Sequence, residues 1–174
     1  DAGFGEGMLA RNDDRFSSEI DISAVFENGL NFYGRTFDSF WVNNNGSVTF
    51  NGGRSSFTPS VITETSNNPE ITPFFADVDT RGGAVTATPG GNSTGSNLVY
   101  WDIDPLNDRI IVTWDDVGYY SSRTDRLNAF QLVLDDRGNG NFDITFRYED
   151  INWTTGNASG GSGGLGGTPA RAGF

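Results

Sequence analysis

Two aspartates at the end of an apolar run are the residues best placed for chemistry in this sequence. Asp77 and Asp79 lie two positions apart at the end of a predicted strand over 71–78, so their side chains point to the same face. Two carboxylates on one face repel unless a cation or an arginine lies between them, and Arg81 is nearby. The pair predicts ion pairing with arginine or backbone, a calcium site, or catalysis. Two adjacent pairs are weaker candidates, because neighbouring side chains diverge: Asp13–Asp14 and Asp115–Asp116.

A second group of oxygen ligands lies in one polar turn. Asp136, Asn139, Asn141 and Asp143 surround glycines there, and calcium requires several hard oxygen donors of this kind. Their spacing does not match the EF-hand loop, and the same residue types also favour a simple hairpin turn. Calcium is thus the one cofactor that the sequence suggests, with these four residues and the Asp77/Asp79 pair as its candidate ligands.

The composition excludes several other kinds of chemistry. The 174 residues include neither cysteine nor histidine, which removes disulfides, thiol catalysis, cysteine-based zinc sites and a Ser/His/Asp triad. The Gly-rich stretch 160–167 lacks the lysine and the βαβ context of a phosphate-binding loop. A carbohydrate-active enzyme is a further alternative, since acids and tryptophans can line a sugar cleft. The four tryptophans fall mostly on predicted strand faces, where core packing is the default: Trp41, Trp101, Trp114 and Trp153.

The charge of the chain limits its partners. A net charge of -12 and a pI of about 4.1 repel phosphate backbones and anionic lipid, so nucleic acid and membrane surfaces are not expected partners. The same charge suits metal cations, basic protein surfaces or simple solubility. No apolar run approaches the roughly 20 residues that a membrane span needs.

The elements that must position these residues are short strands. Hydrophobic residues make up only 35% of the chain, but aromatic residues make up 13%, so we expect a small core built on Phe, Trp and Tyr. Strand patterns flank Asn44-Asn45-Gly46, a strong hairpin signal. Apolar residues alternate with polar ones over 142–148, which predicts a half-buried antiparallel strand. Further strands are expected over these ranges: 84–87, 98–103, 109–117 and 127–134.

These patterns predict one all-β domain over 1–174, an antiparallel β-sandwich with long Gly/Asn-rich loops and little helix. The stretch 154–167 consists almost entirely of Gly, Ser, Thr, Asn and Ala. Its composition fits either a flexible linker or an ordered loop packed tightly against the body.

The order of several segments resembles the nidogen-like (NIDO) domain family. The resemblance covers roughly residues 5–174 and is carried by these segments: 30–34 (LNFYG), 41–46 (WVNNNG), 71–81 (ITPFFADVDTR), 112–120 (VTWDDVGYY), 128–134 (NAFQLVL), 140–144 (GNFDI) and 153–156 (WTTG). It implies a secreted, non-catalytic module used in cell adhesion and matrix or fibre assembly, and it supplies no catalytic residues. The lack of cysteine makes the chain most similar to the bacterial members.

The C-terminal segment 170–174 departs from this pattern. Similar domains continue beyond such a segment into at least one more strand, so we expect the sandwich to lack its last strand. An open edge exposes unpaired backbone, and strand addition by another extracellular protein or a second copy would cover it. The alternative to this structural role is a calcium-dependent module that binds a glycan or a protein.

Overall fold

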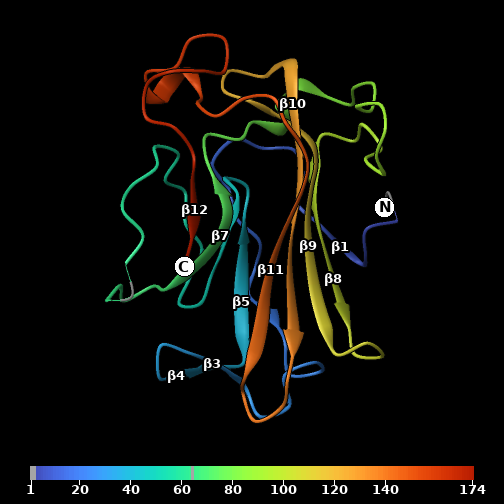
Figure 1. Ribbon diagram of the computed structural model, residues 1–174, viewed down its shortest axis with the longest axis vertical. Helices are drawn as coiled ribbons and strands as arrows, with labels where there is room; N and C mark the ends of the chain where they lie inside the picture. Colours follow the sequence, from blue (N-terminus) through green and yellow to red (C-terminus); the bar gives the residue numbers. More distant parts are fainter. Residues whose placement is uncertain (1–2, 64) are drawn as a thin grey trace.

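The computed structural model describes residues 3–63 and 65–174, which form two antiparallel sheets packed face to face (Figure 1). The first sheet has the order β1-β8-β9-β10-β11, with strands Gly7–Met8, Leu98–Asp104, Arg109–Tyr119, Arg123–Asp136 and Phe142–Ile151. The second has the order β12-β7-β6-β5-β2, with strands Arg171–Gly173, Glu70–Phe75, Ser47–Thr49, Ser39–Asn43 and Ile20–Asp21. A separate hairpin pairs β3 (Leu30–Phe32) with β4 (Arg35–Phe37). The predicted all-β antiparallel sandwich is confirmed.

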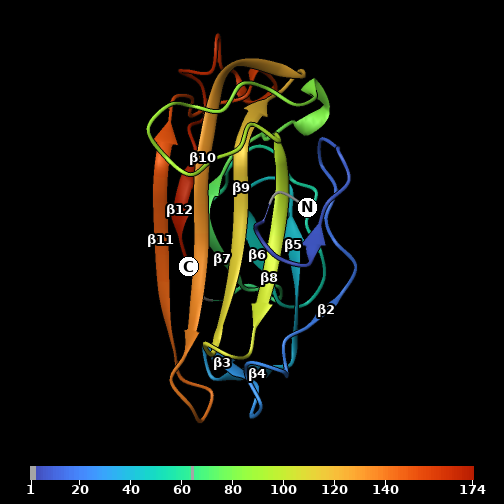
Figure 2. The ribbon, with the colours of Figure 1, turned by 90° about the vertical axis from the view of Figure 1, so that its right-hand side faces the viewer.

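The four long strands β8 to β11 form a continuous meander (Figure 2). Its register places buried apolar residues directly opposite one another: Phe130 faces Trp114, and Leu132 faces Val112. Gln131, between the two, lies on the other face and donates to the Thr113 hydroxyl at 2.8 Å. The alternation read from the sequence therefore does decide which face of this sheet is buried.

The β5–β6 hairpin forms around Asn44-Asn45-Gly46, as predicted. Gly46 has φ of 82°, and a Cβ at this position would lie 1.8 Å from the carbonyl oxygen of Phe74. Only glycine fits there, because the turn is pressed against β7. Asn44 and Asn45 are buried, so this turn lies inside the molecule and its amides contact other segments.

Aromatic rings dominate the core between the sheets, as the composition predicted. Trp114 stacks on Phe130 with ring centroids 5.0 Å apart, and Phe74 meets Trp153 edge-on at 5.5 Å. Both indoles are fully buried and donate to backbone carbonyls at 3.0 Å. These two tryptophans cannot line a sugar cleft on the surface, since their rings are enclosed by the core.

The Gly-rich stretch 154–167 is an ordered loop. Thr154 and Thr155 both donate backbone N–H groups to the carbonyl of Gly164, and a Cβ on Gly164 would lie 2.7 Å from the Cβ of Trp153. Its glycines allow the backbone to approach the core closely. Helix in the described residues is limited to the 3-10 turns η1 (Thr80–Gly82) and η2 (Asn157–Ser159). No helix in the described part of the chain is long and apolar enough to span a membrane.

The strand predicted over 84–87 does not form. Val85 donates to the carbonyl of Gly95 at 2.8 Å, but the segment around it is a loop. Asp115 and Asp116 of β9 instead bind the backbone and hydroxyl groups of this loop. Such side-chain acceptors compete with strand pairing for the backbone donors.

Candidate functional site

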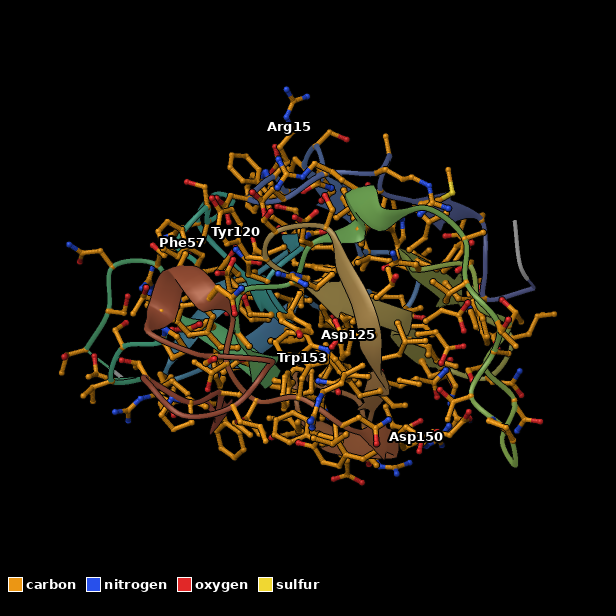
Figure 3. The ribbon with its side chains drawn as sticks, turned by 90° about the horizontal axis from the view of Figure 1, so that it is seen from above. Arg15, Phe57, Tyr120, Asp125, Asp150 and Trp153 are labelled. Atoms are coloured by element: carbon orange, nitrogen blue, oxygen red, sulfur yellow. The ribbon has the colours of Figure 1, made fainter. Side chains whose placement is uncertain are left out.

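Three carboxylates from two distant parts of the chain meet at one end of the sandwich. Asp13 and Asp14 lie in the N-terminal loop, and Asp77 lies just beyond the end of β7. One carboxylate oxygen from each of the three lies within 4.8 Å of the others. Figure 3 looks down on this end of the molecule and labels Tyr120, whose backbone N–H donates to the carbonyl of Asp77 at 3.2 Å. We refer to Asp13, Asp14 and Asp77 as the acidic cluster.

Hydrogen bonds fasten the N-terminal loop beside β7. The hydroxyl of Thr80 accepts from the Asn12 N–H at 2.8 Å and donates to the Asn12 carbonyl at 3.0 Å. The backbone N–H of Asn44 donates to the carbonyl of Arg15 at 3.0 Å, and its side-chain amide donates to the carbonyl of Asp13. The buried β5–β6 turn thus holds the loop from one side, and the residues after β7 hold it from the other.

Asp77 is the buried centre of the acidic cluster. Its exposure is 1%, and its Oδ2 has no hydrogen-bond partner among the described residues. Burial, with a further contribution from Asp13 and Asp14, raises the pKa of Asp77 from 3.8 to about 7. Gly156 closes the site, because a Cβ there would lie 2.3 Å from this same Oδ2. The ordered Gly-rich loop therefore forms a wall over an unpaired carboxylate.

The other two carboxylates are partly neutralised. The Arg81 guanidinium pairs with Asp13 at 2.8 Å, while Oδ1 of Asp13 is buried without a described partner. Burial and the neighbouring Asp79 and Asp14 raise the pKa of Asp13 to about 6, although Arg81 opposes this shift. Asn45 donates to Oδ1 of Asp14 at 2.9 Å. The cluster offers oxygen ligands only, which suits a hard cation.

Asp79 has a different role from Asp77, and both residues lie beyond β7, which ends at Phe75 and not at the predicted residue 78. Its Oδ1 accepts from the backbone N–H and Nε of Arg81, and its Oδ2 accepts from Nη2 of Arg81 and the N–H of Ser122. Burial alone would raise the pKa of Asp79, but these hydrogen bonds outweigh it and hold the pKa below its ordinary value. Both oxygens are engaged within the protein, which matches the ion-pairing alternative for this residue.

The predicted oxygen-rich turn is organised as a hairpin turn. Asp136 accepts from the N–H of Gly138 at 3.0 Å, and Asp143 accepts from Nε of Arg137 at 2.8 Å. Asn141 donates its backbone N–H to the Gly138 carbonyl, and Asn139 adopts φ of 56°, which asparagine tolerates. Among the described residues, the acidic cluster is where three carboxylates converge, and this turn is not. A calcium ion at the turn stays a prediction.

Asp13 and Asp14, the weaker candidates by sequence, belong to the acidic cluster. Adjacent side chains diverge in an extended chain, but both residues lie in bends of the N-terminal loop. Nothing in the local sequence links this loop to the end of β7. The one available signal was the pair of asparagines before Gly46, since amides in a turn can bind backbone of other segments.

A second feature is the open side of the sandwich, where β11 and β12 are the outer strands of the two sheets (Figure 1). A groove of about 320 Å³ lies between them, lined mainly by apolar atoms of Pro73, Phe74, Tyr148 and Ile151. The Tyr148 hydroxyl bridges the sheets by donating to the carbonyl of Pro73 at 2.7 Å, yet its residue is 47% exposed. Within the described chain, no strand pairs with the outer side of β11.

Comparison with known proteins gives a consistent result. A model of the nidogen-like domain matches residues 38–174. Alpha-tectorin of Mus musculus is 40% identical over 176 residues, which cover 93% of this chain and 8% of that protein. Alpha-tectorin of Gallus gallus is 36% identical over 175 residues, with the same two shares. Nidogen of Drosophila melanogaster is 31% identical over 169 residues, covering 85% of this chain and 12% of that protein.

The chain therefore spans about a tenth of the length of the relatives it matches. No solved structure matches it. The match over 38–174 includes six of the seven segments that carried the resemblance. Together with the relatives, it confirms the predicted location outside the cell.

Proposed function

The chain belongs to the nidogen-like domain family, and on that premise we propose that it is a non-catalytic structural module of extracellular assemblies that joins a second copy of itself through β11. The observation that carries the proposal is the open outer edge of this strand. The chain covers only a small share of the length of its relatives, which supports the role of a module within longer proteins.

The edge is long enough to add another strand. β11 has ten residues and pairs with β10 along one side. The backbone groups of its other side are available for pairing, and the apolar groove lies beside them. An added strand would satisfy the backbone groups and cover apolar surface at the same time.

The sequence of β11 is complementary to itself. In an antiparallel pair with the two Thr145 residues opposite each other, Asp143 of one copy faces Arg147 of the other, and Ile144 faces Phe146. A two-fold axis repeats each of these contacts. Opposite charges and apolar side chains placed directly across two strands each contribute roughly 0.2–1 kcal/mol. Strands of another protein would gain the backbone bonds but not this charge pattern, so we assign the edge to a second copy.

The absence of catalysis is part of the proposal. The sequence has no histidine or cysteine, and two of its tryptophans lie in the core. Two narrower expectations stay predictions: a bacterial-type member of the family, and glycans as ligands.

The test is the state of association in solution. Sedimentation velocity up to about 1 mM protein, the range of weak complexes, should show a monomer–dimer equilibrium. Arg147→Asp should shift it to monomer, because Asp143 would then face a like charge. The double variant Asp143→Arg/Arg147→Asp should restore the dimer. Arg123→Asp, an equal charge change at an exposed position of β10, should leave it unchanged. A wild-type chain that stays monomeric, or a double variant that does not recover, would overturn the proposal.

A further inference from the structure

We propose that the acidic cluster is a calcium site, in which one ion is held by carboxylate oxygens of Asp13, Asp14 and Asp77 and fastens the N-terminal loop to the end of β7. This inference is independent of strand addition, because a monomer carries the whole site. It also differs from the sites expected from the sequence, since it uses Asp77 without Asp79 and places no ligand in the turn at 136–143.

The first support is the charge that meets at this point. One carboxylate oxygen from each of Asp13, Asp14 and Asp77 lies within 4.8 Å of the others, and Asp79 lies beside them because it shares Arg81 with Asp13. Arg81 forms ion pairs with two of them, Asp13 and Asp79. Arg11 and Arg15 also line this place, but among the described residues only Arg81 forms ion pairs with these carboxylates, so a divalent ion would add positive charge where two of the four have no cationic partner.

The second and independent support is the set of buried oxygens that the fold leaves unpaired. Asp77, a member of the cluster, has a side chain that is 99% buried, and its Oδ2 has no hydrogen-bond partner among the described residues. The side chain of Asn44 is also fully buried with its Oδ1 unpaired, while its amide nitrogen is fixed between the carbonyls of Asp13 and Val78. Leaving a buried polar atom unpaired costs about 1–3 kcal/mol, so unpaired oxygens on Asp77, on Asp13 and on the neighbouring Asn44 indicate a missing ligand.

The geometry and the chemistry of the donors favour calcium. Calcium binds six to eight oxygens at about 2.3–2.6 Å, so ligands on opposite sides of the ion lie roughly 4.6–5.2 Å apart. The three carboxylate oxygens lie within 4.8 Å of one another, which one such ion can span. Magnesium requires shorter bonds and a rigid octahedron, which irregular loop positions do not supply.

The ion would act as a fastening between segments far apart in the sequence. The N-terminal loop reaches β7 through a few hydrogen bonds, and the chain has no cysteine with which to make a disulfide. A cation that binds only the folded state stabilises it by RT ln(1 + [Ca]/Kd). At calcium concentrations of roughly 10 to 100 times Kd, this raises the melting temperature by about 3–10 °C for a chain of this size.

Calorimetry tests the site with calcium alone as the probe. Wild-type protein, stripped with EDTA and titrated with calcium chloride, should bind one ion and melt several degrees higher. Magnesium should bind more weakly. Asp77→Asn and Asp14→Asn should each reduce calcium affinity at least tenfold. Asp143→Asn, which removes a carboxylate from the predicted turn, is the matched control and should bind like wild type.

Each outcome decides between the alternatives. The proposal fails if about 10 mM calcium, a concentration well above the dissociation constants of the weakest extracellular sites, produces no heat of binding and no change in melting temperature. It also fails if Asp77→Asn keeps the full calcium-dependent shift, or if Asp143→Asn alone loses it. Asparagine has nearly the size of aspartate and carries no charge for the neighbouring carboxylates to repel, so we expect Asp77→Asn to fold. Near-ultraviolet circular dichroism checks this. Because Asp14 is only half-buried, its variant gives a second measurement with little risk to the fold.

Discussion

Two groups of aspartates, each with a buried member, differ in how far their carboxylate oxygens are hydrogen-bonded. Asp115 and Asp116 of β9 accept hydrogen bonds from backbone and hydroxyl groups of residues 88–96, with Asp115 bound by both groups of Thr94 and of Ser96. In the acidic cluster, Asp77 is equally buried, but one of its oxygens has no partner among the described residues. The first group organises a loop, whereas the second has unused capacity for a ligand. Burial alone therefore does not separate structural carboxylates from functional ones, and counting their partners does.

The largest expected effect comes from removing a carboxylate of the Asp115/Asp116 group, whose oxygens accept hydrogen bonds from the loop. Asp115→Ala should lower the free energy of unfolding by about 3 kcal/mol, because it removes the charged acceptor of several donors on the loop. Urea denaturation measures the loss, and hydrogen exchange should show the amides of Thr94 and Ser96 losing protection. A loss below about 0.5 kcal/mol, typical of a surface substitution, would show that the loop does not depend on this carboxylate.

A smaller loss of stability is expected from placing an extra methyl group against Asp77 of the acidic cluster. Gly156→Ala has no conformational penalty from a positive φ, since φ is −69° here, but its Cβ would lie 2.3 Å from Oδ2 of Asp77. We expect a loss of about 2 kcal/mol, as for overpacking elsewhere, together with weaker calcium binding. Thermal melts with calcium and with EDTA measure both. Unchanged stability in both buffers would mean that the Gly-rich loop does not press on Asp77.

The smallest expected effect is in the pH dependence without calcium. Because the pKa of Asp77 is raised to about 7 in the folded state, the folded protein binds more protons than the unfolded chain between about pH 4 and pH 7. Its stability should therefore rise as the pH falls from 8 to 5, by roughly 1–2 kcal/mol, and be lost again as the pH rises through 7. Urea denaturation in EDTA at several pH values measures this slope.

The control for the pH experiment is Asp77→Asn, which cannot titrate. Asp13, whose pKa is also raised, should leave this variant with a shallower slope of the same sign. The variant should also exceed wild type in stability at pH 8, the opposite sign from Asp115→Ala. Equal slopes in the two proteins would show that Asp77 does not titrate in this range, and would weaken the contrast between the two groups.

The sequence by itself determined the sheets and their buried faces. Alternation over β10 and β11, the Asn-Asn-Gly turn between β5 and β6, and the aromatic core all follow from local pattern and residue type, because a strand buries every second side chain. Composition also limited the chemistry to oxygen ligands, since histidine and cysteine are missing.

Only the tertiary structure decided which carboxylates act together. Asp79 and Asp77 have similar local sequence, but Arg81 and Ser122 donate to the oxygens of Asp79, whereas Oδ2 of Asp77 has no partner among the described residues. Asp13 and Asp14 join Asp77 because the buried Asn44 and Asn45 hold the N-terminal loop against the end of β7. The same holds for the Gly-rich loop, whose composition fitted both order and flexibility until its packing on Trp153 was known. The physical reason is that a site depends on contacts between segments distant in sequence, whereas periodicity reports only the burial of each segment.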